Sequence, residues 1–249
     1  MIAVLLSLGA PGLASCGGDS GGPPTASANA PRAAAPRPPE SSASGRLRLS
    51  NRGHPVVWVK RHESVALRAR PGGEVVKRLG PRTEFGSPTV LAVLERRGRW
   101  AGVPAPSLPN GRLGWVRLDP SRLRSGWTRY AVDVDLSRHR AQLLLGNRAL
   151  RSFAVTVGAP ASPTPTGRFA VTDTFRGNLN PVYGCCALAI TATQPSLPSG
   201  WLGGNRIAIH GTQGELGVSA SHGCVRAANA DVSALVRRVP LGSPVVIHG

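Results

Sequence analysis

Histidine and cysteine residues lie close together in one segment of the C-terminal half of the chain. His210-Gly211-Thr212 follows the strand-like residues 206–209, and Ser221-His222-Gly223-Cys224-Val225-Arg226 begins 11 positions after His210. The small residues between the two motifs allow the chain to loop back on itself. A thiol with an ordinary pKa of about 8.5 is mostly protonated at neutral pH, so a nucleophilic cysteine needs a base beside it. The pattern therefore predicts a thiol that an imidazole activates to attack an acyl carbon.

The chemistry of acyl transfer assigns a function to several of these residues. An imidazole would accept the thiol proton and later protonate the leaving amine, while a third group fixes the tautomer of the ring. Gly223 lets the backbone pass close to the reacting carbonyl, and the amides of Gly223 and Cys224 could stabilise the oxyanion. Arg226 could anchor a substrate carboxylate.

These motifs, together with the segment 163–169 (Pro-Thr-Pro-Thr-Gly-Arg-Phe), closely resemble those of the L,D-transpeptidases, the YkuD-type catalytic domain. The resemblance covers residues 128–249. It implies that Cys224 is the nucleophile and that His210 is the base, oriented by the carbonyl of Gly211. It also implies that His222 shapes the pocket and assists. The positions expected beside the substrate are Thr212, Ser221 and Arg226.

The resemblance also implies a reaction on peptidoglycan. Cys224 would attack the carbonyl of the third residue of a tetrapeptide stem, expel the terminal D-Ala and form a thioester. An amine from a neighbouring stem would resolve the thioester and join the two stems. No metal or other cofactor is needed, and sensitivity to carbapenems would follow from the same acylation.

Two other functions use the same residues. In a cell-wall Cys-His peptidase the cysteine precedes its histidine, whereas His248 is the only histidine after Cys224 in this chain. A non-catalytic, wall-binding lipoprotein could keep the fold. The intact set of thiol and imidazole motifs disfavours this second alternative, because a binding protein does not need them.

The adjacent residues Cys185 and Cys186 do not fit the motif simply. They could be two small residues of which one faces the core, or they could form a disulfide with each other. Either thiol could also form a disulfide with Cys224 and switch the enzyme off. A zinc site that combines them with His210, His222 and Cys224 is disfavoured, because the Cys-x-x-Cys spacing of structural zinc sites is missing.

The elements that must position these residues are mostly strands. Residues 130–136 alternate, and Gly146-Asn147 lies between two strand-like runs in 142–150, which predicts a hairpin. Residues 153–158 continue the sheet, and 162–169 form a rigid Pro-rich loop. The C-terminal region adds a short helix with Asn229 as the predicted cap, and one face of this helix carries the apolar residues Val232, Leu235 and Val236. Residues 245–247 then form a last strand.

Residues 55–122 predict a separate, small β-barrel of about five short strands. Residues 67–72 and 111–116 resemble the corresponding segments of bacterial SH3-like domains. Trp100 and Trp115 are expected in the core of this barrel, with a ligand-stacking pair as the alternative. The fold class expected for the chain is therefore mainly β, with an SH3-like barrel before a β-rich catalytic domain that has a short C-terminal helix.

The N-terminal residues indicate export. Residues 1–15 are apolar and end in Leu13-Ala14-Ser15-Cys16, which resembles a bacterial lipobox, so a signal peptide and acylation of Cys16 are predicted. A plain signal peptide with an incidental cysteine is the alternative, and no Lys or Arg precedes the apolar run. Residues 16–45 are rich in Gly, Pro, Ala and Ser and predict an extended tether. We expect an extracytoplasmic protein, lipid-anchored and facing the cell wall or secreted.

Composition and charge exclude some classes of protein and indicate which polyanions this one could meet. The chain has 249 residues, a net charge of +18 and 41% hydrophobic residues, so it is too apolar to be a disordered basic tail. No stretch approaches the ~18 apolar residues of a membrane-spanning helix. Residues 46–126 carry 17 basic and 5 acidic groups. Because an exported protein meets no cytoplasmic nucleic acid, the expected polyanions are wall polymers or lipid headgroups.

Overall fold

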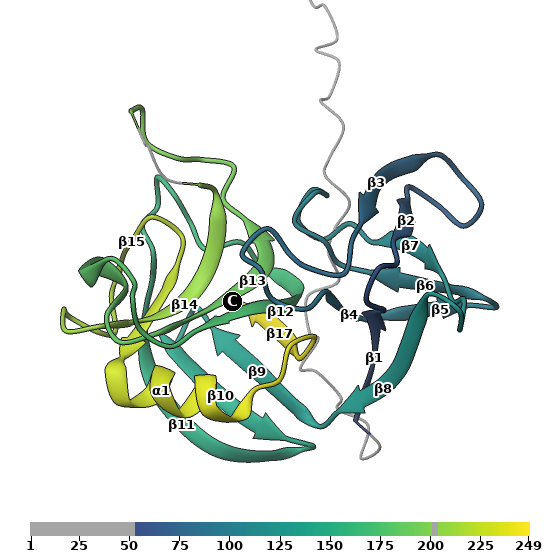
Figure 1. Cartoon of the computed structure of the whole chain (residues 1–249). Coiled ribbons are helices and arrows are strands. Elements are labelled where there is room, and N and C mark those ends of the chain that lie inside the picture. The colour runs from purple at the N-terminus through teal and green to yellow at the C-terminus, as the bar shows by residue number, and fades with distance from the viewer. Residues whose placement is uncertain (1–52, 201–203) are drawn as a thin grey trace, which may run out of the picture. The chain divides into compact units, whose positions relative to one another are not determined.

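The computed structural model describes residues 53–200 and 204–249, which are mainly β strands with one α-helix (Figure 1). These residues belong to one compact unit. The expected fold class is thus confirmed in its mainly β character. The predicted signal peptide, the acylated Cys16 and the linker 16–45 lie outside the described residues.

The first half of the described chain forms two antiparallel sheets. The smaller has the order β4-β1-β8 and consists of β1 (His54–Val59), β4 (Val90–Ala92) and β8 (Leu123–Thr128). The larger has the order β3-β2-β7-β6-β5, and its strands are β2 (Val65–Arg68), β3 (Val75–Leu79), β5 (Glu95–Arg97), β6 (Trp100–Val103) and β7 (Gly114–Arg117).

The sequence predicts about five strands here, and residues 53–128 contain eight. The additional strands β3 and β5 expose most of their residues and β8 exposes three of its six, so they lack the buried alternation by which the others are recognised. Trp115 is buried, as expected for a core residue, and Trp100 is half-buried. A core of Val57, Val59, Val65, Leu67, Leu91, Ala101, Val103, Ala105, Val116 and Leu123 holds these sheets together.

The second half forms a nine-stranded mixed sheet with the order β10-β9-β17-β12-β13-β14-β16-β11-β15. Its strands are β9 (Tyr130–Asp135), β10 (Arg140–Leu145), β11 (Arg148–Gly158), β12 (Gly167–Phe175), β13 (Ala187–Thr193), β14 (Arg206–Thr212), β15 (Ser219–Ser221), β16 (Val225–Ala228) and β17 (Pro244–His248). A 3-10 helix, η1 (Pro181–Tyr183), precedes β13.

The predicted hairpin is present between β10 and β11. Leu145 pairs with Arg148, which leaves Gly146-Asn147 as a two-residue turn, and Gly146 has the positive φ of 57° that such turns favour. Strand β11 pairs with β10 through its first half and with β16 through its second half. This one long strand therefore joins β10, at one end of the sheet, to β16, near the other end, and holds β16 in place.

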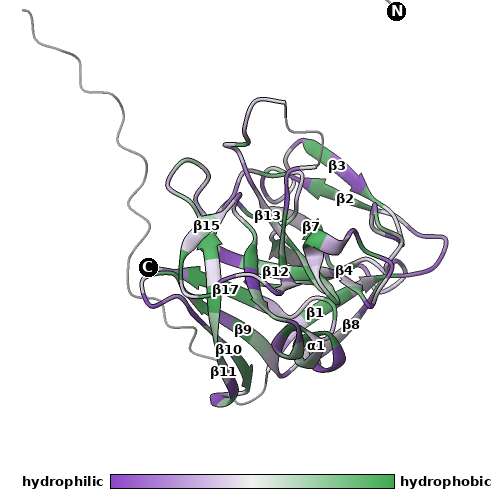
Figure 2. Ribbon diagram, turned by 90° about the vertical axis from the view of Figure 1, so that its left-hand side faces the viewer, coloured by the Kyte–Doolittle hydropathy of each residue, from purple (hydrophilic) through white to green (hydrophobic). Residues whose placement is uncertain are grey.

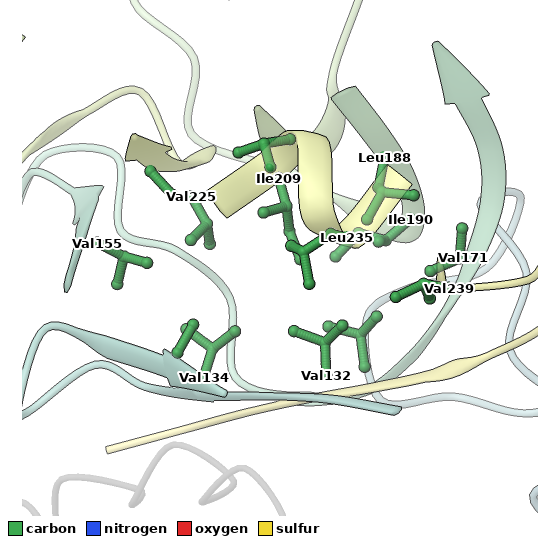
Figure 3. Packing of buried hydrophobic residues seen from close by; sticks show 14 of the residues in the cluster. Val132, Val134, Val155, Val171, Leu188, Ile190, Ile209, Val225, Leu235 and Val239 are labelled. Carbon is green, nitrogen blue, oxygen red and sulfur yellow. The ribbon is translucent and has the colours of Figure 1, made fainter. Parts of the chain in front are cut away.

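The core of this half lies between strands and the single helix α1 (Asn229–Arg238), which packs against β13, β14 and β16. Side chains of Val132 and Val134 point from β9 toward those of Ile209 and Leu235 (Figure 3). The helix buries Val232, Leu235 and Val236, as the sequence predicts, and its last turn carries Arg237 and Arg238. The helix consequently shows both hydrophobic and hydrophilic residues (Figure 2).

No helix of the described chain has the length and apolar character needed to cross a membrane.

The prediction that Asn229 caps α1 is wrong. Ala228 occupies the N-cap position without a side-chain cap, and Asn229 is the first helical residue. The Asn229 side chain instead accepts a hydrogen bond from the backbone N of Cys185 (3.0 Å). Its amide oxygen therefore ties the start of the helix to the segment before β13.

Candidate active site

The parallel strands β14 and β16 place the predicted residues on one face of the sheet. Ile209 pairs with Val225, and both are buried in the core. His210 pairs with Arg226 at the next position, so these two side chains lie on the opposite face. Strand β14 extends through Thr212, which puts His210 inside the strand, whereas the sequence predicts it at the strand end.

Cys224 immediately precedes β16 and lies on the same side as His210. Its Sγ accepts a hydrogen bond from the backbone N of Ala208 (3.4 Å). The thiol is therefore level with Ala208, two residues before His210, and the two side chains are diagonal neighbours on adjacent strands. Among the described residues no hydrogen bond joins the Cys224 thiol to the His210 imidazole.

The ring of His210 is held by two neighbours. Nδ1 lies 2.9 Å from the carbonyl O of Gly211, as the resemblance implies. A carbonyl can only accept, so Nδ1 carries the proton and Nε2 is left with a free lone pair. The Tyr183 ring meets the imidazole edge to face at 5.1 Å between centroids. Tyr183 lies on η1, 27 positions before His210, and no motif marked it in the sequence.

Ser221 holds the turn that carries the thiol. Its Oγ donates to the carbonyl O of Cys224 (2.6 Å) and accepts from the backbone N of Gly223 (3.1 Å). The residue is 1% exposed, so the expectation that it contacts substrate is corrected to a positioning role. The Gly223 amide is likewise occupied by Ser221 Oγ, so of the two amides predicted to stabilise an oxyanion only that of Cys224 stays a candidate.

The Pro-rich loop braces the same turn from the other side. Thr164 Oγ1 donates to the carbonyl O of Gly223 (2.9 Å) and accepts from the backbone N of Gly158 (2.8 Å). Gln194 Nε2 donates to the carbonyl oxygens of Pro163 (2.9 Å) and His222 (3.4 Å). The turn is thus fixed through buried polar side chains that sequence reasoning did not single out.

Glycine is required at position 223. Its φ is +106°, which side chains rarely adopt, and a Cβ there would lie 2.3 Å from Gln194 Nε2. Gly211 is required for a different reason, because a Cβ would lie 2.1 Å from Asn229 Oδ1. Both glycines of the motifs therefore allow a close approach of polar groups that hold the site.

A cavity of about 560 Å³ opens beside the imidazole strand. Arg226 and Thr212 line it, together with Pro181, Val182, Gly184, Cys185, Gln213 and Asn229; that the first two contact substrate stays a prediction. Thr212 Oγ1 also accepts from the backbone N of Gly214 (3.0 Å). His222 is exposed in the turn that precedes Cys224.

Cys185 and Cys186 form a disulfide with each other, while Cys224 is a free thiol. The structure therefore has the second of the three arrangements considered for this pair. Cys186 also belongs to the core and is 4% exposed. Within residues 53–200 and 204–249 no group of three His, Cys, Asp or Glu side chains could hold a metal ion.

The surroundings of Cys224 and His210 shift the pKa values of both side chains. Burial raises the pKa of the Cys224 thiol, and the hydrogen bond from Ala208 together with the Arg226 charge opposes this rise. Burial lowers the pKa of His210, and Arg226 lowers it further, against the effect of the Gly211 carbonyl. At neutral pH the resting pair is therefore a neutral thiol and a neutral imidazole.

The family model and the related sequences that match this chain all name the same family. The model of the L,D-transpeptidase catalytic domain, YkuD, matches residues 129–247. Two Bacillus subtilis (strain 168) proteins are similar in sequence. "Putative L,D-transpeptidase YkuD" is 29% identical over 121 residues, 48% of this chain and 66% of that protein. "Putative L,D-transpeptidase YqjB" is 31% identical over 127 residues, 47% of this chain and 69% of that protein. The chain thus spans about two thirds of the length of these relatives.

Solved structures with similarity include L,D-transpeptidase 3 from Mycobacterium tuberculosis in complex with a faropenem-derived adduct. It is 17% identical with a TM-score of 0.43, and the match covers 55% of this chain and 73% of that one. An Enterococcus faecium L,D-transpeptidase C442S mutant is 21% identical with a TM-score of 0.36, over 48% of this chain and 49% of that one.

Proposed function

This chain belongs to the YkuD-type L,D-transpeptidase family, and we propose that it cross-links peptidoglycan stems with Cys224 as the nucleophile. The observation that carries the proposal is the common face of β14 and β16, on which a free thiol, an imidazole with a fixed tautomer and a guanidinium come together. The donor is a tetrapeptide stem and the acceptor is an amine of a neighbouring stem.

Acylation begins with proton transfer from the Cys224 thiol to Nε2 of His210. The sulfur attacks the carbonyl carbon of the third stem residue and forms a tetrahedral intermediate, whose negative oxygen accepts from the Cys224 amide. When the intermediate collapses, the bond to the nitrogen of D-Ala breaks and the imidazolium protonates that nitrogen. A thioester on Cys224 and free D-Ala result.

Deacylation reverses the roles of the same groups. The acceptor amine attacks the thioester carbonyl, and His210 accepts the proton that the amine loses as the new amide forms. The sulfur then leaves and takes the proton back, which restores the neutral pair of thiol and imidazole. No oxidant, metal or nucleotide enters the balance of either step.

The cavity lined by Arg226 and Thr212 suits an anionic peptide, although neither His210 nor Cys224 lines it. Arg226 lines it, and a guanidinium can hold a carboxylate through two parallel hydrogen bonds. Thr212 and Gln213 add polar side chains along the same wall. We infer that this cavity takes stem-peptide carboxylates, while His222 borders the entrance to the thiol.

The surrounding parts of the chain extend this proposal. Residues 1–15 would act as a signal peptide and Cys16 would carry lipid, so that the linker 16–45 lets the enzyme reach the wall from the membrane surface. Residues 55–122 would form an SH3-like module that contacts the wall. The protein would then act outside the cytoplasm, either anchored or secreted.

Incubation of the chain with a tetrapeptide-containing muropeptide tests the function. We expect products of joined stems and free D-Ala, both absent with Cys224→Ala, whose folding is checked by its thermal unfolding midpoint. Hydrolysed stems without joined products would favour the peptidase alternative. Binding of muropeptide without any covalent change would favour a non-catalytic wall-binding protein.

A further inference from the structure

A second cavity lies on the five-stranded sheet of the first half and shares no residue with the thiol site. Its volume is about 500 Å³, and it is bordered mainly by residues of β2, β3, β6 and β7 and of the loops next to them. Five arginines line it, together with one tryptophan and one acidic residue: Arg68, Arg78, Arg99, Arg117, Arg122, Trp100 and Asp119.

The strand register brings these arginines together from separate parts of the chain. Arg117 pairs with Trp100 across β6 and β7, and Arg78 pairs with Ala66 across β2 and β3. The backbone N of Leu118 donates to the carbonyl O of Arg99 (2.7 Å), which fixes Arg99 beside the end of β7. The cluster therefore follows from the fold, and it is absent as a run in the sequence.

The positive charge of this cavity is mostly uncompensated. Arg122 reaches Glu63 (3.3 Å) and the carbonyl O of Ser64 (3.1 Å), and Arg68 donates to the carbonyl O of Gly73 (2.5 Å). In the part of the chain that the structure describes, the side chains of the three other arginines make no hydrogen bond or ion pair; they are Arg78, Arg99 and Arg117.

Asp119 supplies the one negative charge in the wall. It accepts from the backbone N (2.9 Å) and the Oγ (2.7 Å) of Ser121, and these bonds lower its pKa, with a smaller effect of Arg117 and Arg122. Asp119 in the wall and Glu63 beside Arg122 are two carboxylates against five guanidinium groups, which leaves an excess of positive charge for anions from solution to neutralise.

We propose that this cavity binds the phosphate groups of a polyol phosphate, a polymer in which phosphodiesters alternate with short polyols. Guanidinium groups recognise phosphate oxygens by paired hydrogen bonds, and several of them in one hollow suit a ligand with repeated anionic groups. The half-buried Trp100 offers an apolar surface for the polyol carbons. A single aromatic residue in the wall is too few for a stacking platform of the kind that single-stranded nucleic acids use.

Titration calorimetry of the full chain with poly(glycerol phosphate) tests the site, with uncharged polyglycerol of equal length as the reference. The double variant Arg99→Gln/Arg117→Gln should lose about tenfold or more in affinity, because two guanidinium groups no longer donate charge-assisted hydrogen bonds to phosphate oxygens. The matched control Arg112→Gln/Arg148→Gln removes the same charge from exposed positions outside the cavity and should change affinity less than about threefold.

The Arg99→Lys/Arg117→Lys variant keeps the charge and should bind with intermediate affinity, since lysine cannot form the paired contacts. An equal loss in the cavity and control variants would overturn the proposal, because net charge alone would then explain binding. Poly-L-glutamate that binds as tightly as poly(glycerol phosphate), or more tightly, would show carboxylate recognition. Single-stranded DNA that does so would show nucleic-acid recognition, and either result also overturns the proposal. The readout is independent of catalysis, so its failure leaves the proposed transpeptidase function untouched.

Discussion

Arg226 lies directly opposite His210 on the neighbouring parallel strand, and its charge acts on both reacting groups. It lowers the pKa of the His210 imidazole and opposes the rise that burial causes in the pKa of the Cys224 thiol. One guanidinium thus adds to the effect of burial on the pKa of His210 and partly offsets the effect of burial on the pKa of Cys224. Under the proposed function, Arg226 would influence proton transfer as well as hold substrate.

Replacement of Arg226 by glutamine should raise the pKa of both groups, because the positive charge that lowers each pKa is lost. The acid limb of the acylation rate should then move to higher pH, and alkylation of Cys224 by iodoacetamide should also require higher pH. Arg226→Lys keeps the charge and should move both profiles less. Opposite shifts of the two profiles, or equal shifts in both variants, would contradict this role.

The wild-type pH profile of carbapenem acylation should show an acid limb below the ordinary histidine pKa of 6.5. The limb lies at this low pH because the pKa of His210 is lowered. The imidazole stays neutral, and able to accept the thiol proton, until the pH falls below this lowered pKa. Above it the rate should stay level through neutral pH, since the thiol pKa is raised. Stopped-flow kinetics on the full chain measure this profile.

The control for that profile is His210→Gln. Loss of a general base should reduce the acylation rate by about 10²–10⁴-fold, and the acid limb should disappear with the imidazole. A limb that persists in this variant would assign the titration to another group, of which the exposed His222 is the nearest in sequence to Cys224.

Thr164→Val should destabilise the protein by about 1–3 kcal/mol, because the Gly158 amide and the Gly223 carbonyl would lose a buried partner. Thr164→Ser keeps the hydroxyl and should retain most of the stability. Chemical denaturation measures both. Activity of Thr164→Val should also fall at temperatures where it remains folded, as the thiol turn loosens. Equal stability of the valine and serine variants would show that these two hydrogen bonds contribute little.

Alkylation under denaturing conditions without reductant should label Cys224 and leave Cys185 and Cys186 unlabelled. The reason is that the two neighbours form a disulfide with each other while Cys224 is free. Both should become labelled after reduction, which peptide mapping would detect. Linkage of either residue to Cys224 in the unreduced digest would contradict the arrangement and support an inactivating disulfide instead.

Most of the strands and the grouping of His210, Cys224 and Arg226 could be predicted from the sequence because their patterns are local. The alternation of 130–136 and the Gly146-Asn147 turn each depend on neighbouring residues and lie where predicted, and the first histidine motif lies within β14, slightly inside the predicted strand end. The long β11 was predicted in pieces, because its first half exposes several residues and lacks clear alternation. Strand β3 escaped for the same reason, as it is exposed almost throughout.

The residues that hold the site could not be predicted, since their contacts join distant segments. Thr164 meets Gly223 across 59 positions, and Asn229 meets Cys185 across 44. Asn229 was predicted as a helix cap because an asparagine side chain commonly bonds to backbone amides nearby in sequence, but its side chain bonds instead to the distant amide of Cys185. Ser221 was predicted to contact substrate, yet burial turns its hydroxyl to the turn itself. The basic cavity similarly depends on strand register.

Mass spectrometry of the full chain, quenched during reaction with a tetrapeptide stem, tests the role of Cys224 most directly. We expect a peptide that contains position 224 to carry the first three stem residues as a thioester, with release of one D-Ala for each adduct and no adduct in Cys224→Ala. An acyl group on any other residue, or cross-linked products formed by the alanine variant, would show that this sulfur is not the nucleophile.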